Sequence, residues 1–181
     1  RISIVHEQSG VTRDRVAARA SFGGQHFMLV DTGGLGVHLH GKKNVGVFDG
    51  LIRDQVADIV AEADAIVWVV DCQSGMTPQD EEVAAFLREA ERPVIVAANK
   101  ADNDDQALTA DVEFPAAGFD AIQPTSCTQN LGIDDLLERI IGVIPSVEHS
   151  GGIEDDLKVA VVGRPNVGKS SLINQIVGTE R

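Results

Sequence analysis

Aromatic residues are scarce in this 181-residue sequence, which has one Trp, no Tyr and an aromatic share of 4%. Because hydrophobic residues still account for 43% of the chain, aliphatic side chains must supply most of the core. No apolar run reaches the ~18 residues that a membrane-spanning helix needs, and no secretory signal pattern opens the chain. These absences predict a cytoplasmic globular protein without a membrane partner.

Cysteine and positive charge are also in short supply. The spacing of Cys72 and Cys127 fits neither a metal site nor a redox pair, so we expect both thiols to be reduced and buried. The 28 acidic residues outnumber the 15 lysines and arginines, for a formal net charge of −13. That charge argues against a nucleic-acid site within the segment itself. The first residue is Arg1 rather than Met, which suggests a piece of a longer protein.

Short apolar runs alternate with longer amphipathic segments along the chain. The runs, which are typical of buried strands, are Phe27–Val30, Ala65–Val70, Val94–Ala98 and Val159–Val162. Helical periodicity marks Leu51–Ala63, Pro78 to about Ala90, Ile133–Ile141 and Lys169–Val177, and Thr77 is the predicted N-cap of the second of these helices. Strand–helix alternation predicts an α/β fold with a mostly parallel sheet.

One stretch has the composition of a linker. Residues 145–157 read PSVEHSGGIEDDL, with one Pro, two Gly and four acids, which is typical of a connector. We therefore divide the chain into residues 1–144, the acidic linker 145–157, and a C-terminal segment, 158–181.

The strongest motif lies in that C-terminal segment, where residues 163–170 read GRPNVGKS. It matches the phosphate-binding pattern G-x-x-x-x-G-K-[ST] between a predicted strand and a predicted helix. Backbone N–H groups of such a loop surround phosphate oxygens, Lys169 would reach the β- and γ-phosphates, and the Ser170 hydroxyl would hold Mg²⁺. The expected nucleotide contacts here are Asn166, Val167, Gly168, Lys169, Ser170 and Ser171. The motif therefore predicts the three-layer α/β fold of a P-loop NTPase of the small-GTPase type.

A second motif indicates which base is bound. Asn99-Lys100-Ala101-Asp102 follows the run Val94–Ala98, at the end of a strand where α/β proteins bind ligands. The Asp102 carboxylate can accept two N–H bonds from guanine, whereas adenine lacks that donor pair. The Lys100 stem can lie over the base. Ser126 and Cys127 could place backbone N–H groups on the guanine oxygen.

Two weaker patterns fit the phosphate end of such a site. In Asp31-Thr32-Gly33-Gly34, the aspartate can hold Mg²⁺ and the N–H of Gly34 can contact the γ-phosphate. The Thr12 hydroxyl could complete the Mg²⁺ shell. Taken alone, Asp31–Gly34 is also typical of an ordinary turn after a strand, and the residues around Thr12 are barely a motif. Together, Thr12, Asp31, Asn99, Ser126 and Lys169 make up the parts of a GTPase, with the phosphate-binding loop last instead of first.

These residues carry a resemblance to a family. The chain resembles the Der (EngA) GTPases, which have two G domains in tandem and assist assembly of the large ribosomal subunit. VTRDR at residues 11–15 and VDTGG at residues 30–34 look like the first G domain, and KVAVVGRPNVGKSSLIN at residues 158–174 looks like the start of the second. The resemblance covers essentially the whole chain. It departs from the family pattern at Glu7 and Ser9, where an aspartate and a proline are usual, and at Cys127, where alanine is usual.

The resemblance implies function as well. It implies GTP or GDP with Mg²⁺ as cofactors, hydrolysis of GTP, and a large-subunit precursor as partner of the full-length protein. Leu35 stands where Ras-like enzymes carry a water-orienting glutamine, and the family implies K⁺ near the phosphates instead, with Asn166 as a ligand. The expected catalytic residues are thus Lys169, Thr12, Gly34 and Asn166, and the Mg²⁺ ligands are Ser170, Thr12 and Asp31.

Two structural outcomes stay open for the C-terminal segment. Residues 158–181 could insert their strand into the sheet and complete a permuted G domain, or the strand could stay detached and leave the sheet without a central member. We favour insertion, because a buried apolar strand is costly to leave in water. Two other functions stay open too: a nucleotide-switched binding module with little hydrolysis, and a stand-alone GTPase that is native in this order.

Overall fold

The computed structural model describes residues 16–32, 50–145 and 157–178, and its strands form one six-stranded sheet. The strand order is β1-β2-β6-β3-β4-β5. The strands are β1 (Val16–Phe22), β2 (Gln25–Asp31), β3 (Ala65–Asp71), β4 (Val94–Asn99), β5 (Ile122–Pro124) and β6 (Leu157–Val162). β1 pairs antiparallel with β2, and the other pairings are parallel. The predicted α/β fold with a mostly parallel sheet is confirmed.

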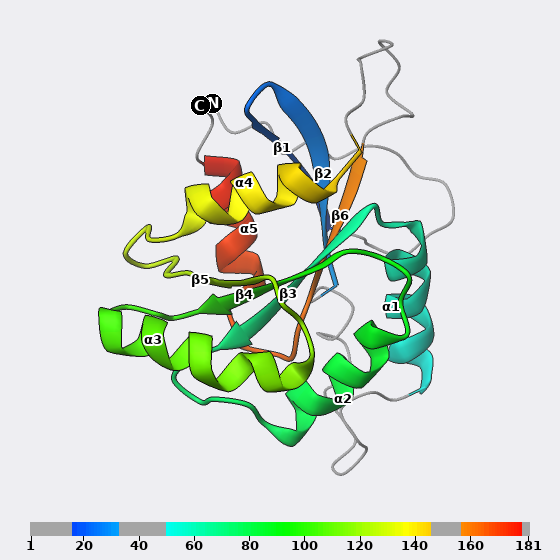
Figure 1. Cartoon of the computed structure of the whole chain (residues 1–181). Coiled ribbons are helices and arrows are strands. Elements are labelled where there is room, and N and C mark those ends of the chain that lie inside the picture. Colours follow the sequence, from blue (N-terminus) through cyan, green and yellow to red (C-terminus); the bar gives the residue numbers. More distant parts are fainter. Residues whose placement is uncertain (1–15, 33–49, 146–156, 179–181) are drawn as a thin grey trace.

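Helices cover both faces of this sheet (Figure 1). They are α1 (Gly50–Glu62), α2 (Pro78–Arg88), α3 (Asp104–Glu113), α4 (Ile133–Val143) and α5 (Lys169–Gly178), with a short 3₁₀ helix, η2 (Phe114–Ala117). α1, α2 and α3 lie on one face, and α4 and α5 lie on the other. Within the described ranges, none of the helices is both long and apolar enough to cross a membrane.

The strand β3 shows how the two cores are built. All seven of its residues are buried, and successive side chains point to opposite faces. Trp68 and its alternate neighbours pack with α1 and α2, whereas Val67 and its alternate neighbours pack with α4 and α5. A strand covered on both faces is continuously apolar, which explains why the run Ala65–Val70 contains no polar residue.

The predicted elements are present, with adjusted ends. α2 ends at Arg88 instead of near Ala90, and α4 continues to Val143. The Thr77 hydroxyl accepts a hydrogen bond from the backbone N–H of Asp80 at 3.3 Å, and the Asp80 carboxylate accepts one from the backbone N–H of Thr77 at 3.1 Å. This reciprocal capping box confirms Thr77 as the N-cap.

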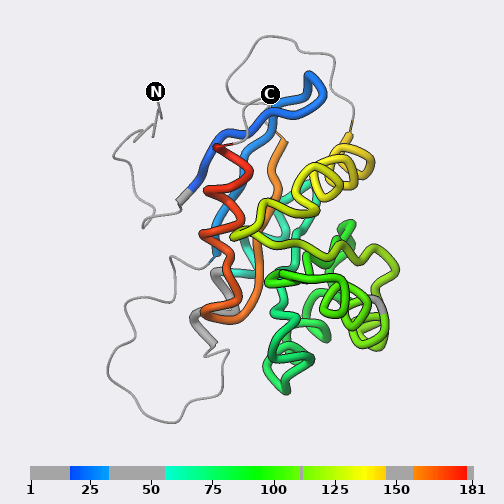
Figure 2. Tube along the Cα trace, turned by 90° about the vertical axis from the view of Figure 1, so that its left-hand side faces the viewer, coloured from blue at the N-terminus to red at the C-terminus, as the bar shows by residue number. Residues whose placement is uncertain are grey.

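The last strand of the chain occupies the centre of the sheet. β6 lies between β2 and β3, and its residues Val159–Val162 are at most 1% exposed. The Thr32 hydroxyl donates to the Val161 carbonyl at 2.8 Å, across 129 residues of sequence. Figure 2 shows α5 running back alongside β6 and the β1–β2 hairpin. The boundaries at residues 144/145 and 157/158 stay predictions, because residues 146–156 lie outside the described part of the chain.

Candidate guanine-nucleotide site

Four strand ends define the location of the candidate site. β2 ends at Asp31, β3 at Asp71, β4 at Asn99 and β6 at Val162. Because these strands are parallel, their carboxyl ends lie at one edge of the sheet. Open α/β sheets bind their ligands at this edge. Most of the polar residues predicted to form the site therefore come together here.

Residues 163–170 form the turn between β6 and α5. Gly168 has a φ of 100°, and a Cβ at this position would lie 2.3 Å from Nδ2 of Asn99, so only glycine is accommodated. The Val167 carbonyl accepts a hydrogen bond from that same Nδ2 at 2.8 Å. Asn166 is exposed and has a φ of 65°. The backbone is thus tightly wound at the N-terminus of α5, as an anion-binding loop requires.

Lys169 is held inside this loop. The residue is 7% exposed, and its Nζ donates to the carbonyl oxygens of Gly163 at 2.7 Å and Arg164 at 2.8 Å. Burial lowers the pKa of Lys169, Asp31 acts in the opposite direction, and the Arg164 charge lowers it further. A desolvated ammonium gains more from a neighbouring anion than an exposed one does, so the loop is suited to phosphate.

Ser170 and Asp31 form the candidate metal position. The Ser170 hydroxyl donates to Oδ2 of Asp31 at 2.9 Å, which joins the start of α5 to the end of β2. Hydroxyl and carboxylate oxygens are the ligands that Mg²⁺ prefers, so this donor set fits the ion. Ser171 is exposed in the first turn of α5. Thr12 and Gly34, the other predicted residues of this end, lie outside the described residues.

Asn99 links three of the predicted motifs. Its side chain donates to the phosphate-binding loop at Val167, and its Oδ1 accepts from the backbone N–H of Cys127 at 3.4 Å and from the Cys127 thiol at 3.2 Å. The expectation that both thiols are buried is correct for Cys72 and wrong for Cys127. Cys127 is half-buried, because it lies in the loop that follows β5. Burial raises the pKa of Cys72 to about 12 and that of Cys127 to about 11.

Asp102 is oriented by its neighbours. Its Oδ1 accepts hydrogen bonds from the hydroxyls of Ser126 at 2.5 Å and Thr128 at 3.0 Å, and its Oδ2 accepts one from the Gln73 amide at 3.3 Å. Ser126 is fully buried, whereas Asp102 is exposed. A carboxylate fixed at the surface in this way can present its oxygens to the paired N–H donors of a guanine base.

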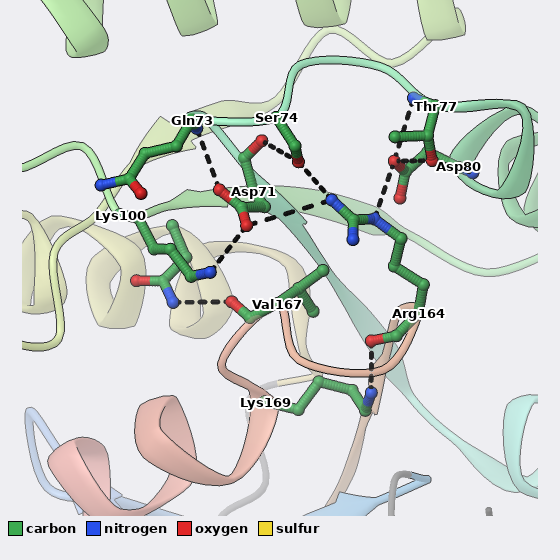
Figure 3. Close-up of polar contacts among 10 residues, drawn as sticks. Asp71, Gln73, Ser74, Thr77, Asp80, Lys100, Arg164, Val167 and Lys169 are labelled. Carbon is green, nitrogen blue, oxygen red and sulfur yellow. Dashed lines mark hydrogen bonds and ion pairs between the residues drawn. The ribbon is translucent and has the colours of Figure 1, made fainter.

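Two further residues belong to the site but were not predicted. Asp71 accepts a hydrogen bond from the Lys100 ammonium at 2.7 Å, and Arg164 directs its guanidinium toward Asp71 and away from Lys169 (Figure 3). Sequence held a signal for Asp71, since it follows the run Ala65–Val70 directly, as Asp31 follows Phe27–Val30. Arg164 occupies a variable position of the loop pattern, so the pattern carries no information about its side chain.

Comparison with known proteins identifies relatives of this chain. The model of the family described as 50S ribosome-binding GTPase matches residues 1–100 and 158–181. GTPase Der of Moorella thermoacetica is 43% identical over 181 residues, which is all of this chain and 40% of that protein. GTPase Der of a Cyanothece species is 42% identical over all of this chain and 39% of its own length. The chain thus spans about 40% of the length of these relatives.

Solved structures resemble the fold. Era in complex with MgGDPNP and nucleotides 1506–1542 of 16S ribosomal RNA superimposes with a TM-score of 0.56 at 22% identity, over 84% of this chain and 51% of Era. An Aquifex aeolicus Era variant bound to GDP·AlF₄⁻ gives a TM-score of 0.57, also at 22% identity, over 85% and 52%. These likenesses establish the P-loop GTPase fold. With the family match across the motif-bearing segments at both ends, the chain belongs to the 50S ribosome-binding GTPases.

Proposed function

We propose that this chain binds guanine nucleotide with Mg²⁺ and hydrolyses GTP to GDP and phosphate. The observation that carries the proposal is the convergence of Lys169, the Ser170–Asp31 pair and the Asn99–Asp102 loop at one edge of the sheet. These residues come from three distant parts of the chain, and the central position of β6 brings them together. The C-terminal segment then completes the site of the N-terminal part.

Each group would have a distinct role in this site. Lys169 and the N–H groups of residues 166–171 would neutralise the phosphates, and charge stabilisation of this kind supplies most of the catalysis in phosphoryl transfer. Ser170 and Asp31, with Thr12, would hold Mg²⁺. Asp102 would select guanine, oriented by Ser126. When held by these residues, Mg²⁺ would supply positive charge that offsets the negative charge of the phosphates.

The description of the family also suggests a cellular role. The family is described as ribosome-binding, so we propose that the full-length protein acts in the cytoplasm on a precursor of the large ribosomal subunit. The chain itself carries a formal net charge of −13, which argues against an RNA contact within this segment.

The proposal is tested by titrating fluorescent GDP and ADP analogues, with Mg²⁺, into the wild type and Lys169→Ala. We expect guanine-selective binding in the wild type and at least a 100-fold loss in the variant, since a desolvated charge–phosphate contact is removed. Lys158→Ala is the matched control, because Lys158 lies on β6, the strand that leads into the phosphate-binding loop, and its ammonium forms an exposed pair with Glu62 at 3.3 Å. Equal binding by wild type and Lys169→Ala would refute the proposed site.

Potassium dependence is a separate prediction. Asn166 is exposed in the phosphate-binding loop, where its side-chain oxygen could bind a monovalent cation beside the phosphates. We expect GTP turnover to be faster in K⁺ than in Na⁺ at equal ionic strength, and Asn166→Ala to remove the difference. Equal turnover in the two salts by the wild type would rule out this role of K⁺.

A further inference from the structure

Arg164 lies within the phosphate-binding loop, yet its side chain does not face the phosphate side. The backbone carbonyl of Arg164 accepts from Lys169, while its guanidinium extends in the opposite direction, toward the loop between β3 and α2 (Figure 3). There the guanidinium donates to Oδ2 of Asp80 at 3.1 Å and to the Ser74 hydroxyl. The side chain is only 15% exposed. A phosphate-binding loop is therefore tied to α2 by a largely buried cation.

The partner of that cation is itself a buried charge. The Asp80 side chain is fully buried at the first turn of α2, where it also completes the capping box with Thr77. A buried carboxylate needs an opposite charge and hydrogen-bond donors. Arg164 supplies both, so the position of the guanidinium is strongly determined by the fold.

Asp71 connects the same cation to the base-recognition loop. Its Oδ2 lies 2.7 Å from Nζ of Lys100 and 4.0 Å from Nη2 of Arg164, and its Oδ1 accepts from the backbone N–H of Gln73 at 2.9 Å. Burial alone would raise the pKa of Asp71, but the bond from Lys100, the Gln73 N–H and the two positive charges lower it below its usual value. Asp71 therefore stays ionised at neutral pH.

The contact with Asp71 matters for the orientation of the Lys100 side chain. Lys100 has a φ of 65°, which is unfavourable for a residue with a side chain, and its side chain is 36% exposed. A long, half-exposed lysine without a fixed partner would sample many rotamers. The Asp71 carboxylate restrains the ammonium, so the apolar stem keeps one orientation at the base-binding end of the site.

We propose that Asp71 and Arg164 are positioning residues that couple the phosphate-binding loop to the base-recognition loop of the guanine-nucleotide site. The inference rests on the proposed function, because it concerns that site. Arg164 fixes the loop against α2, Asp71 fixes Lys100, and the ion pair between Arg164 and Asp71 makes the two ends of the site depend on one another. Neither residue touches nucleotide in this scheme.

The test is a double-mutant cycle on GDP affinity with Asp71→Asn, Arg164→Gln and the combination of both. Each single change is expected to weaken GDP binding about tenfold, the equivalent of one charge-assisted hydrogen bond. The double variant is expected to bind about as weakly as the weaker single variant, since the two residues act as one unit. Fully additive losses in the cycle would overturn the coupling. Glu62→Gln, which breaks an exposed ion pair remote from the site, should bind like the wild type.

A second variant keeps the test decisive if a buried change impairs folding. Lys100→Met retains the apolar stem over the base but cannot pair with Asp71, and its site is half-exposed. It should reproduce the loss seen for Asp71→Asn, whereas wild-type affinity would overturn the positioning role. All affinities are measured at a temperature where the Trp68 emission shows every variant to be folded. A loss that disappeared under those conditions would be structural and would also overturn the proposal.

The outcomes distinguish failure of the proposed function from failure of the coupling alone. If the wild type binds no guanine nucleotide, the proposed function fails and the inference fails with it. If the wild type binds GDP while Asp71→Asn and Lys100→Met bind equally well, the proposed function stands and the coupling alone is refuted.

Discussion

At the scale of single residues, the two thiols show how burial controls reactivity. Their pKa values are raised to about 12 for Cys72 and about 11 for Cys127, mainly by burial. The thiolate is the reactive form. Because burial raises the pKa of Cys127 from the ordinary thiol value of 9.0 to about 11, its thiolate fraction at pH 8 falls about 100-fold.

We predict that, at pH 8, iodoacetamide modifies Cys127 about 100-fold more slowly in folded than in denatured protein, and Cys72 more slowly still. Mass spectrometry of the two cysteine peptides measures both rates. The raised pKa of Cys127 also makes the free energy of unfolding depend on pH. The folded state keeps the thiol proton where the unfolded state loses it, so the contribution of Cys127 is constant below pH 9 and decreases as the pH rises toward 11. Cys127→Ala should react only at Cys72, and fast alkylation of its folded form would contradict the burial of Cys72.

Residues with a fixed spacing were predictable, and residues whose partners come from the fold were not. The pattern G-x-x-x-x-G-K-[ST] located Lys169 and Ser170 because the chemistry requires neighbouring positions. Asp71 meets Lys100 and Arg164 only through the parallel pairing of β3 with β4 and β6. No spacing in sequence encodes such a contact.

At the scale of elements, α4 depends on the glycine that precedes it. Gly132 is the N-cap of α4 with a φ of 67°, and a Cβ at this position would lie 2.1 Å from the carbonyl oxygen of Pro124. Both the backbone conformation and the close approach exclude a side chain. The start of α4 is thereby packed directly on the end of β5.

Gly132→Ala is therefore expected to lower the free energy of unfolding by about 2 kcal/mol or more. The control is Gly142→Ala, in the last turn of the same helix, where a Cβ would meet nothing within 4 Å. There alanine should stabilise the protein by about 0.4–1 kcal/mol. Urea titrations of the two variants measure both effects, and equal stabilities would be inconsistent with the close contact at Gly132.

Elements with strong apolar patterns were predictable, and elements with weak ones were missed. β3 and β6 are continuous apolar runs because both of their faces are covered. β1 is rich in alanine, which has low β propensity, and β5 has only three residues. The acid-rich residues 102–105 indicated the start of a helix, but the extent of α3 was not predicted, because its large apolar side chains face outward: Leu108 is 64% and Val112 is 78% exposed.

At the scale of the whole molecule, β6 unites the chain. It pairs with β2 on one side and β3 on the other, and both cores contain its residues. The sequence left open whether this strand inserts or stays detached, because a linker of 13 residues reaches either position. The sheet order that the structure adopts depends on the energy of burying β6, which local patterns do not encode.

We predict that a chain ending at Pro145 shows no cooperative thermal unfolding, because β2 and β3 would lose their shared neighbour. The reference is the chain ending at Gly178, which retains β6 and α5 and should unfold in one transition. Trp68, the single tryptophan, is fully buried against Phe119, so its emission and far-UV circular dichroism should report the same midpoint. A cooperative transition for the shorter chain would show that β6 is dispensable.

The central place of the last strand has a consequence when this 181-residue chain is synthesised by itself. β2 and β3 emerge early, but the strand between them follows β3 by about 90 residues, which is roughly 5–20 s at ordinary elongation rates. During that interval the nascent sheet has two open, apolar edges at its middle. Chaperones that shield such edges should therefore matter more for the yield of this chain than for an α/β domain whose central strand is made first.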